Sequence, residues 1–214
     1  MKHVSLDIET LSTNCGNAVI TQIGAVVFDD MSGVIEARSK VFFRALQLYP
    51  QTQELDRVID ESTLRWWFDQ AVKFNRSPFG EMPPCNPATA MQDFFRFLRD
   101  NMELDDQGRV KGFIWCNGTD FDASNVKNMG DFYYENLPWK HNTFRDMRSL
   151  ITAAEYAGIP EMTDRPRGDD IPHNALLDAS NQAASIIYYI NALRRFKVTK
   201  EALDAGVSMG PVEL

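Results

Sequence analysis

Residues 3–10, His-Val-Ser-Leu-Asp-Ile-Glu-Thr, predict a β-strand that ends in two acidic side chains. Asp7 and Glu9 are two positions apart, so in a strand they point to one face, while Leu6 and Ile8 point to the other. Two adjacent carboxylates repel each other unless a positive charge lies between them. A hard divalent cation with oxygen ligands fits that position. These residues alone are equally compatible with an edge strand whose exposed face is acidic.

The composition is that of an ordinary soluble globular protein. The chain has 214 residues, of which 44% are apolar and 24% charged, enough for one large domain or two small ones. Its three cysteines, Cys15, Cys85 and Cys116, are scattered and form no Cys-x-x-Cys pair. This usage predicts reduced thiols, a cytoplasmic location and no thiolate zinc site.

Charge and hydropathy limit the possible partners. No apolar run approaches the roughly 18 residues of a membrane span, and the N-terminus lacks the features of a signal peptide, so we expect no membrane contact. The net charge of −8 argues against tight nonspecific binding to a polyanion. This net charge does not exclude an enzyme that holds nucleic acid briefly through bound metal and a small groove.

The first half of the chain predicts an antiparallel meander followed by an insertion. Strands are expected at 19–28 and 34–46, joined by a turn at 31–33, and with the first strand they make a three-strand meander. Residues 47–87 then predict a helical and loop insertion, with a helix beginning near residue 60 and a proline-rich loop after it.

The second half alternates helices and strands. Helices are predicted at 88–101, 123–134 and 149–158 and from about 173 onward, and strands at 110–116 and 142–148. The order βββ-α-β-α-β-α predicts one α/β domain over residues 1–214, with a mixed five-stranded sheet flanked by helices.

Further acidic residues lie at the ends of other elements. Asp120 and Asp122 follow a buried strand, and Asp178 lies at the start of the last helix, five residues after His173. Each has a structural alternative: Asp122 as a helix cap, Asp178 as an acid favoured by the helix dipole, His173 as a loop residue. Together with the first two acids, they match what two-metal phosphodiester hydrolysis requires, with a histidine as proton acceptor.

Three segments resemble the motifs of a known family. Residues 7–10 (Asp-Ile-Glu-Thr), residues 117–122 (Asn-Gly-Thr-Asp-Phe-Asp) and the pair His173-x4-Asp178 resemble, in order, those of the DEDDh or DnaQ-like 3′–5′ exonucleases. The resemblance implies a ribonuclease H-like fold. Within the group, residues 7–11, 23–29 and 63–67 are most similar to phage exodeoxyribonuclease A and the small bacterial exoribonucleases, which implies a bacterial or phage-encoded protein and suggests a homodimer.

The resemblance also implies roles for the acids and the histidine. Asp7, Glu9 and Asp178 would bind one Mg²⁺ or Mn²⁺ ion, and Asp7 and Asp122 a second one. His173 would be the general base. Asp120 does not match the family motif.

Substrate contacts follow from the same resemblance. Thr10 would contact the 3′-hydroxyl and Leu11 the terminal base.

The expectation for the tandem tryptophans rests on helix geometry alone. Adjacent helical positions let at most one of Trp66 and Trp67 face the core squarely. Tandem tryptophans more often pack in the core than bind a ligand. The ring that does not face the core, which we assign to Trp66, would cover the site or stack on a base.

The function expected from these features is metal-dependent 3′–5′ removal of nucleoside monophosphates from the 3′ end of single-stranded DNA or RNA. Arg165 and Arg167 are candidates for phosphate contact, or solvated loop charges. Two alternatives are a ribonuclease H-fold hydrolase of other nucleotide ends and a catalytically silent nucleic-acid-binding domain. The presence of all five catalytic positions argues against the silent domain, and the histidine-containing motif favours exonuclease chemistry.

Overall fold

The computed structural model describes residues 1–30, 34–35, 40–79, 82–163 and 173–195. In these residues the strands are β1 (Lys2–Thr10), β2 (Ile20–Asp29), β3 (Val34–Ile35), β4 (Val41–Ala45), β5 (Ile114–Cys116) and β6 (Phe144–Asp146). The helices are α1 (Tyr49–Glu54), α2 (Glu61–Phe74), α3 (Pro87–Asn101), the π-helix η1 (Thr119–Ala123), α4 (Ser124–Tyr133), α5 (Met147–Tyr156) and α6 (Ala175–Arg195).

The strands form one mixed sheet in the order β3-β2-β1-β5-β6, with β4 also paired to β2. β2 runs antiparallel to β1, β3 and β4, while β1, β5 and β6 are parallel. This arrangement confirms the predicted fold class. The predicted third strand is present as the two strands β3 and β4, and the turn predicted at 31–33 lies outside the described residues.

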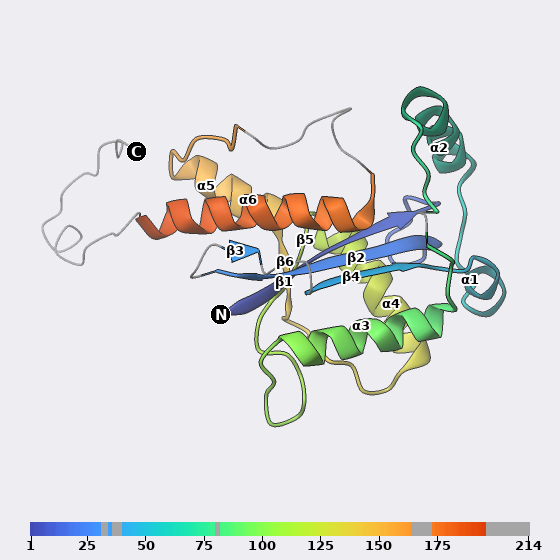
Figure 1. Ribbon diagram of the computed structural model, residues 1–214, viewed down its shortest axis with the longest axis horizontal. Coiled ribbons are helices and arrows are strands. Elements are labelled where there is room, and N and C mark those ends of the chain that lie inside the picture. The colour runs from blue at the N-terminus through green and yellow to red at the C-terminus, as the bar shows by residue number, and fades with distance from the viewer. Residues whose placement is uncertain (31–33, 36–39, 80–81, 164–172, 196–214) are drawn as a thin grey trace, which may run out of the picture.

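Helices cover both faces of the sheet (Figure 1). Val4, Leu6 and Ile8 point from β1 into a core shared with α3 and α4, and Phe28 and Trp115 pack on the opposite face with α5 and α6. Each face therefore has its own apolar layer, as α/β architectures require. No helix in the described ranges is long and apolar enough to cross a membrane.

The predicted insertion contains α1, which the sequence pattern did not indicate, and α2. In Figure 1, α2 stands apart from the layered body, beyond the carboxyl end of β1. Asp60, the residue before α2, accepts hydrogen bonds from Ser12 Oγ at 2.7 Å and Thr13 N at 3.0 Å. Trp67 Nε1 donates to the Thr10 carbonyl at 3.0 Å. These bonds hold α2 against the segment that follows β1.

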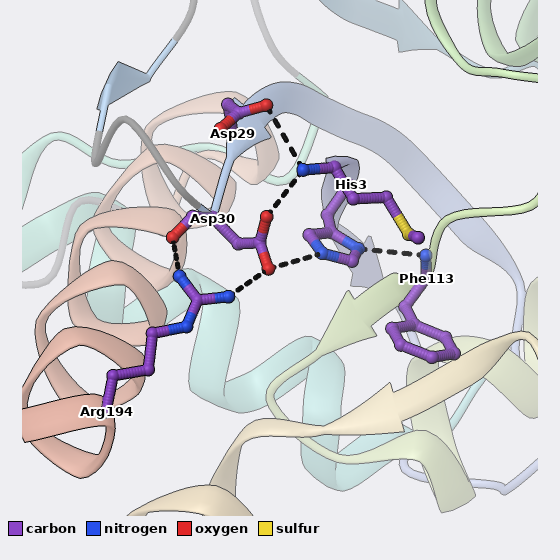
Figure 2. Close-up of polar contacts among 6 residues, drawn as sticks. His3, Asp29, Asp30, Phe113 and Arg194 are labelled. Atoms are coloured by element: carbon purple, nitrogen blue, oxygen red, sulfur yellow. Dashed lines mark hydrogen bonds and ion pairs between the residues drawn. The ribbon is translucent and has the colours of Figure 1, made fainter. Parts of the chain in front are cut away.

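At the opposite end of β1, charged groups join three elements (Figure 2). The Met1 ammonium donates to Asp30 Oδ1 at 2.7 Å, and Arg194 in the last turn of α6 donates to the other oxygen of the same carboxylate. His3 Nδ1 accepts from Phe113 N at 3.0 Å, and its Nε2 lies 3.5 Å from Asp30 Oδ2. Asp30 thus ties the start of β1 and the end of α6 to the end of β2.

Candidate active site

β1 delivers the first two acids to one face of the sheet. Asp7 pairs with Gly24 of β2, and Glu9 pairs with Gln22. Because their neighbours Leu6 and Ile8 are buried in the core shared with α3 and α4, the two acids point to the face that α6 covers. The predicted alternation of apolar and acidic positions is present.

Gly24 allows α6 to approach these acids. A Cβ at Gly24 would lie 2.1 Å from the carbonyl carbon of Ala175, so a larger residue would push the start of α6 away from the sheet. Gln22 Oε1 accepts from Ala175 N at 3.3 Å on the same side. The close approach places Asp178, in the first turn of α6, beside the β1 carboxylates, and Asp178 Oδ2 accepts from Asn174 N at 3.0 Å.

The segment after β5 separates the two candidate acids of the second motif. Asp122 is 6% exposed, and its Oδ2 lies 3.5 Å from the donor Gly118 N, whereas Asp120 is exposed. Asp146, at the end of β6, accepts from Thr119 N at 3.2 Å and so anchors the start of this turn. The structure therefore brings Asp122, and not Asp120, to the other carboxylates.

The four carboxylates lie close enough together for the charges of the other three to act on Asp7. Burial raises the pKa of Asp7 well above its usual value, and the charges of Asp122, Glu9 and Asp178 raise it further. Burial, followed by the charges of Asp178 and Asp122, raises the pKa of Glu9 to about 8. Burial also raises the pKa of Asp122 to about 7 and that of Asp178 to about 6. A positive charge placed among such acids would favour their ionised forms, and a metal ion would have to displace their protons to bind.

His173 lies at the edge of this cluster. Its ring meets Trp66 edge-on, with 4.9 Å between centroids, and its backbone φ of 50° is in the left-handed region. Burial and then the charge of Arg76 lower the pKa of His173, which keeps the imidazole neutral and able to accept a proton. Potential ligand atoms of Glu9, His173 and Asp178 all lie within 4.8 Å of one another. The structure thus places the predicted base next to two predicted metal ligands.

Two neighbouring cavities open at the carboxyl end of β1. The first, of about 290 Å³, is lined by Asp7, Ile8, Glu9, Asn117, Met147, His173, Asp178, Asn181, Gln182 and Ser185. The second, of about 460 Å³, is lined by Ile8, Glu9, Thr10, Ser12, Thr13, Ser62, Thr63, Trp66, Trp67 and Phe121. Ile8 and Glu9 border both, so the two cavities adjoin at Glu9.

The predicted substrate contacts fall in different environments. Thr10 lines the second cavity, but its hydroxyl donates to the Ser12 carbonyl at 2.8 Å. Trp66 is 40% exposed there, whereas Trp67 is 4% exposed and packs in the core. Leu11, expected to contact the terminal base, is 1% exposed and belongs to a buried cluster with Val19 and Trp67. It lines neither cavity, because the chain after β1 turns it inward.

Other residues of the site were not anticipated from the sequence. Gln182 donates from Nε2 to Asp7 Oδ1 at 2.6 Å, and Arg76 lies close enough to lower the pKa values of His173 and Asp178. The position of Gln182 four residues after Asp178, on the same helix face, was a usable signal. Arg165 and Arg167, the predicted phosphate contacts, lie outside the described residues.

The donor set fits a hard divalent cation. In the part of the chain that the structure describes, no lysine or arginine forms an ion pair with Asp7, Glu9, Asp122 or Asp178. Buried carboxylate oxygens without a paired cation are the ligands that Mg²⁺ and Mn²⁺ prefer. An acidic site of this kind is in keeping with the general use of divalent metals by exonucleases of this fold.

The fold is shared with solved nuclease structures. Exonuclease I in its apo form superposes with a TM-score of 0.59 and 16% identity, over 97% of this chain and 47% of that one. E. coli Exonuclease I in complex with a dT13 oligonucleotide gives a TM-score of 0.59 and 15% identity, over 95% and 45%. Cell-death related nuclease 4 gives a TM-score of 0.55 and 14% identity, over 89% and 64%. This chain thus spans between 45% and 64% of these proteins, and at such identities the likeness shows the fold.

The sequence itself matches a family. Among curated protein sequences none matches this chain. The family model described as the 3′-5′ exoribonuclease Rv2179c-like domain matches residues 2–190, which contain all three predicted motifs. This match confirms the resemblance to the 3′–5′ exonucleases, although the branch within them stays a prediction. The chain belongs to the family of 3′-5′ exoribonuclease Rv2179c-like domains.

Proposed function

We propose that this protein is a metal-dependent 3′–5′ exonuclease that removes nucleoside monophosphates from single-stranded nucleic acid. The observation that carries the proposal is the convergence of Asp7, Glu9, Asp122 and Asp178 with His173 at one end of the sheet. Three separate segments supply these residues, and their raised carboxylate pKa values indicate a site built to hold positive charge.

The residues have distinct roles in this reaction. Asp7, Glu9 and Asp178 would hold one cation, and Asp7 and Asp122 a second. When bound, two divalent cations would supply an activated water and neutralise charge on the leaving 3′-oxygen. His173, kept neutral by burial and by Arg76, accepts the proton of the attacking water.

The second cavity accommodates the terminal nucleotide. The exposed ring of Trp66 offers a stacking surface, and Thr10, Ser62 and Thr63 offer polar groups along the same wall. Base stacking on an aromatic side chain contributes about 1–3 kcal/mol per base and tolerates any sequence. Glu9 lines both cavities, so a nucleotide in the second cavity would place its phosphate beside the cations that the carboxylates would hold.

Single-stranded RNA is the first substrate to test, because the family description names exoribonucleases. Solved relatives of the same fold carry dT13 or dA16 oligonucleotides, so DNA belongs in the same assay. Matched RNA and DNA oligonucleotides labelled at either end are incubated with Mg²⁺ or Mn²⁺. We expect a descending ladder from the 5′-labelled strand and immediate release of labelled mononucleotide from the 3′-labelled strand. Internal cleavage, or binding without hydrolysis, would contradict the proposal.

A further inference from the structure

Gln182 is a cavity residue to which the three motifs and the proposed reaction assign no role. It lies on α6, one turn after Asp178, and is 8% exposed. Its Nε2 donates to Asp7 Oδ1 at 2.6 Å. In this orientation the amide nitrogen is the donor and the carboxylate oxygen the acceptor, an arrangement that favours the ionised form of Asp7. Among the residues that the structure describes, Gln182 is the side chain that donates a hydrogen bond to the Asp7 carboxylate.

The other end of the same amide is unpaired. Gln182 Oε1 is buried and has no hydrogen-bond partner among the residues that the structure describes. Burying an amide oxygen without a partner destabilises a fold, because its hydrogen bonds to water are lost. An unbranched apolar side chain such as methionine would fill a similar volume without that loss. Packing alone therefore does not account for a glutamine here.

The hydrogen bond links two parts of the site that are far apart in sequence. Asp7 lies on β1, and Gln182 lies on the helix that also carries Asp178, with 175 positions between donor and acceptor. Because Gln182 donates to Oδ1 of Asp7, it favours one orientation of the carboxylate while lone pairs on both oxygens stay available to cations. A carboxylate ligand whose orientation is set by a hydrogen bond binds metal more tightly.

We propose that Gln182 is a positioning residue that orients the Asp7 carboxylate for cation binding. The inference rests on the metal site of the proposed function and adds to it a residue outside the family motifs. Hydrogen bonds of this kind typically change metal affinity by about 10- to 100-fold when they are removed.

Three variants test this role by calorimetric titration of the metal-free protein with Mn²⁺ and no nucleic acid. Gln182→Met keeps the side-chain length and removes the donor, while Gln182→Asn keeps the amide but shortens its reach. Ser180→Ala is the matched control, because the Ser180 hydroxyl donates within α6 to the Leu176 carbonyl at 2.8 Å. We expect both Gln182 variants to raise the Mn²⁺ dissociation constant about 10- to 100-fold, and the control to bind like the wild type.

Melting temperatures and rates separate positioning from a general defect. Without metal, Gln182→Met should melt close to the wild type, because it loses a hydrogen bond but also an unpaired buried oxygen. Its exonuclease rate should recover largely at saturating Mn²⁺, since the ligands themselves are intact. If Gln182→Met folds poorly, the Mn²⁺ titration of Gln182→Asn tests the inference instead.

The outcomes are distinguishable. Wild-type Mn²⁺ affinity in either folded Gln182 variant would overturn the inference and leave Gln182 a packing residue. Equal loss of affinity in Ser180→Ala would also overturn it, since any change in α6 would then suffice. A wild-type protein that binds no Mn²⁺ would instead contradict the proposed function.

Discussion

The acids at the two ends of β1 have pKa values shifted in opposite directions. At the start of the strand, burial would raise the pKa of Asp30, but hydrogen bonds from the Met1 ammonium and Arg194 outweigh it and hold that pKa below its usual value (Figure 2). At the carboxyl end, burial and mutual repulsion raise the pKa values of Asp7 and Glu9. The same strand and the same helix α6 contribute to both ends.

This difference separates a structural charge cluster from a functional one. Where the protein supplies its own cations, an acid stabilises the fold, as Asp30 does. At the carboxyl end, the described residues form no ion pair with the clustered carboxylates, so ionising these acids destabilises the fold until something positive binds. The carboxyl end of β1 is therefore the end at which a ligand is needed.

The largest expected effect is that of Asp7→Asn. This change removes a ligand shared by both proposed cations, so turnover should be abolished. It also relieves repulsion among the carboxylates, so the metal-free variant should melt at or above the wild-type temperature. Melting scans with and without Mn²⁺ measure both effects, since a ligand that binds the folded state raises its melting temperature. An equal Mn²⁺ response in the two proteins would remove Asp7 from the site.

A pair of substitutions around Phe121 tests which acid completes the cluster. Asp122 is buried with the other carboxylates and Asp120 is exposed. We therefore expect Asp122→Ala to eliminate hydrolysis of a labelled oligonucleotide, while Asp120→Ala, its internal control, retains most of the rate. The reverse order would show that the second motif has been assigned to the wrong acid.

His173→Ala should lower the rate by roughly 10²- to 10⁴-fold, because the proton acceptor is lost. Burial and Arg76 lower the pKa of His173, so the wild-type rate should decline only toward acidic pH, as the imidazole becomes charged. The residual rate of the variant should instead rise with pH, because hydroxide replaces the missing base. Profiles of rate against pH at saturating Mn²⁺ measure this. A variant with a near-normal rate and the same acidic decline would exclude His173 as the base.

Metal-free stability should depend on pH in a direction set by the carboxylates. The pKa values of Glu9, Asp122 and Asp178, about 8, 7 and 6, exceed those of about 4 in an unfolded chain. Between about pH 4 and pH 8 the folded state therefore binds more protons than the unfolded chain. The free energy of unfolding consequently falls as the pH rises through this range. The slope is about 1.4 kcal/mol per pH unit for each extra proton. Urea titrations in EDTA measure it, and saturating Mg²⁺ should flatten it. A flat curve in EDTA would refute the raised pKa values.

The smallest effect is expected at the opposite end. Asp30→Asn weakens hydrogen bonds between charged groups, which should cost about 1–3 kcal/mol and lower the melting temperature by roughly 2–10 °C. Hydrolysis at 25 °C and the Mn²⁺ response should stay at wild-type levels. Asp106→Asn removes an equal charge from an exposed position and serves as the control. A loss of Mn²⁺ affinity in Asp30→Asn alone would show that the two ends are coupled through α6.

Much of the site was predictable from the sequence because its determinants are local. Alternation along β1 indicates that Asp7 and Glu9 share a face, and the ends of later elements indicate Asp120, Asp122, His173 and Asp178. The resemblance to the exonuclease motifs then selects Asp122 over Asp120. The mixed sheet follows from the order of the elements. Each of these inferences depends on the period of a strand or on residues at the end of an element, which neighbouring residues encode.

Tertiary structure decided what depends on contacts between distant segments. Leu11 is buried because the chain after β1 turns inward beneath α2. Trp66 is the exposed ring of the pair because Trp67 packs inward and its Nε1 donates to the Thr10 carbonyl. Gln182 meets Asp7 because Gly24 lets α6 lie directly on the sheet. Local spacing places Gln182 on the helix face of Asp178, but its contact with Asp7 depends on how closely α6 packs on the sheet and on which side chains remain between them.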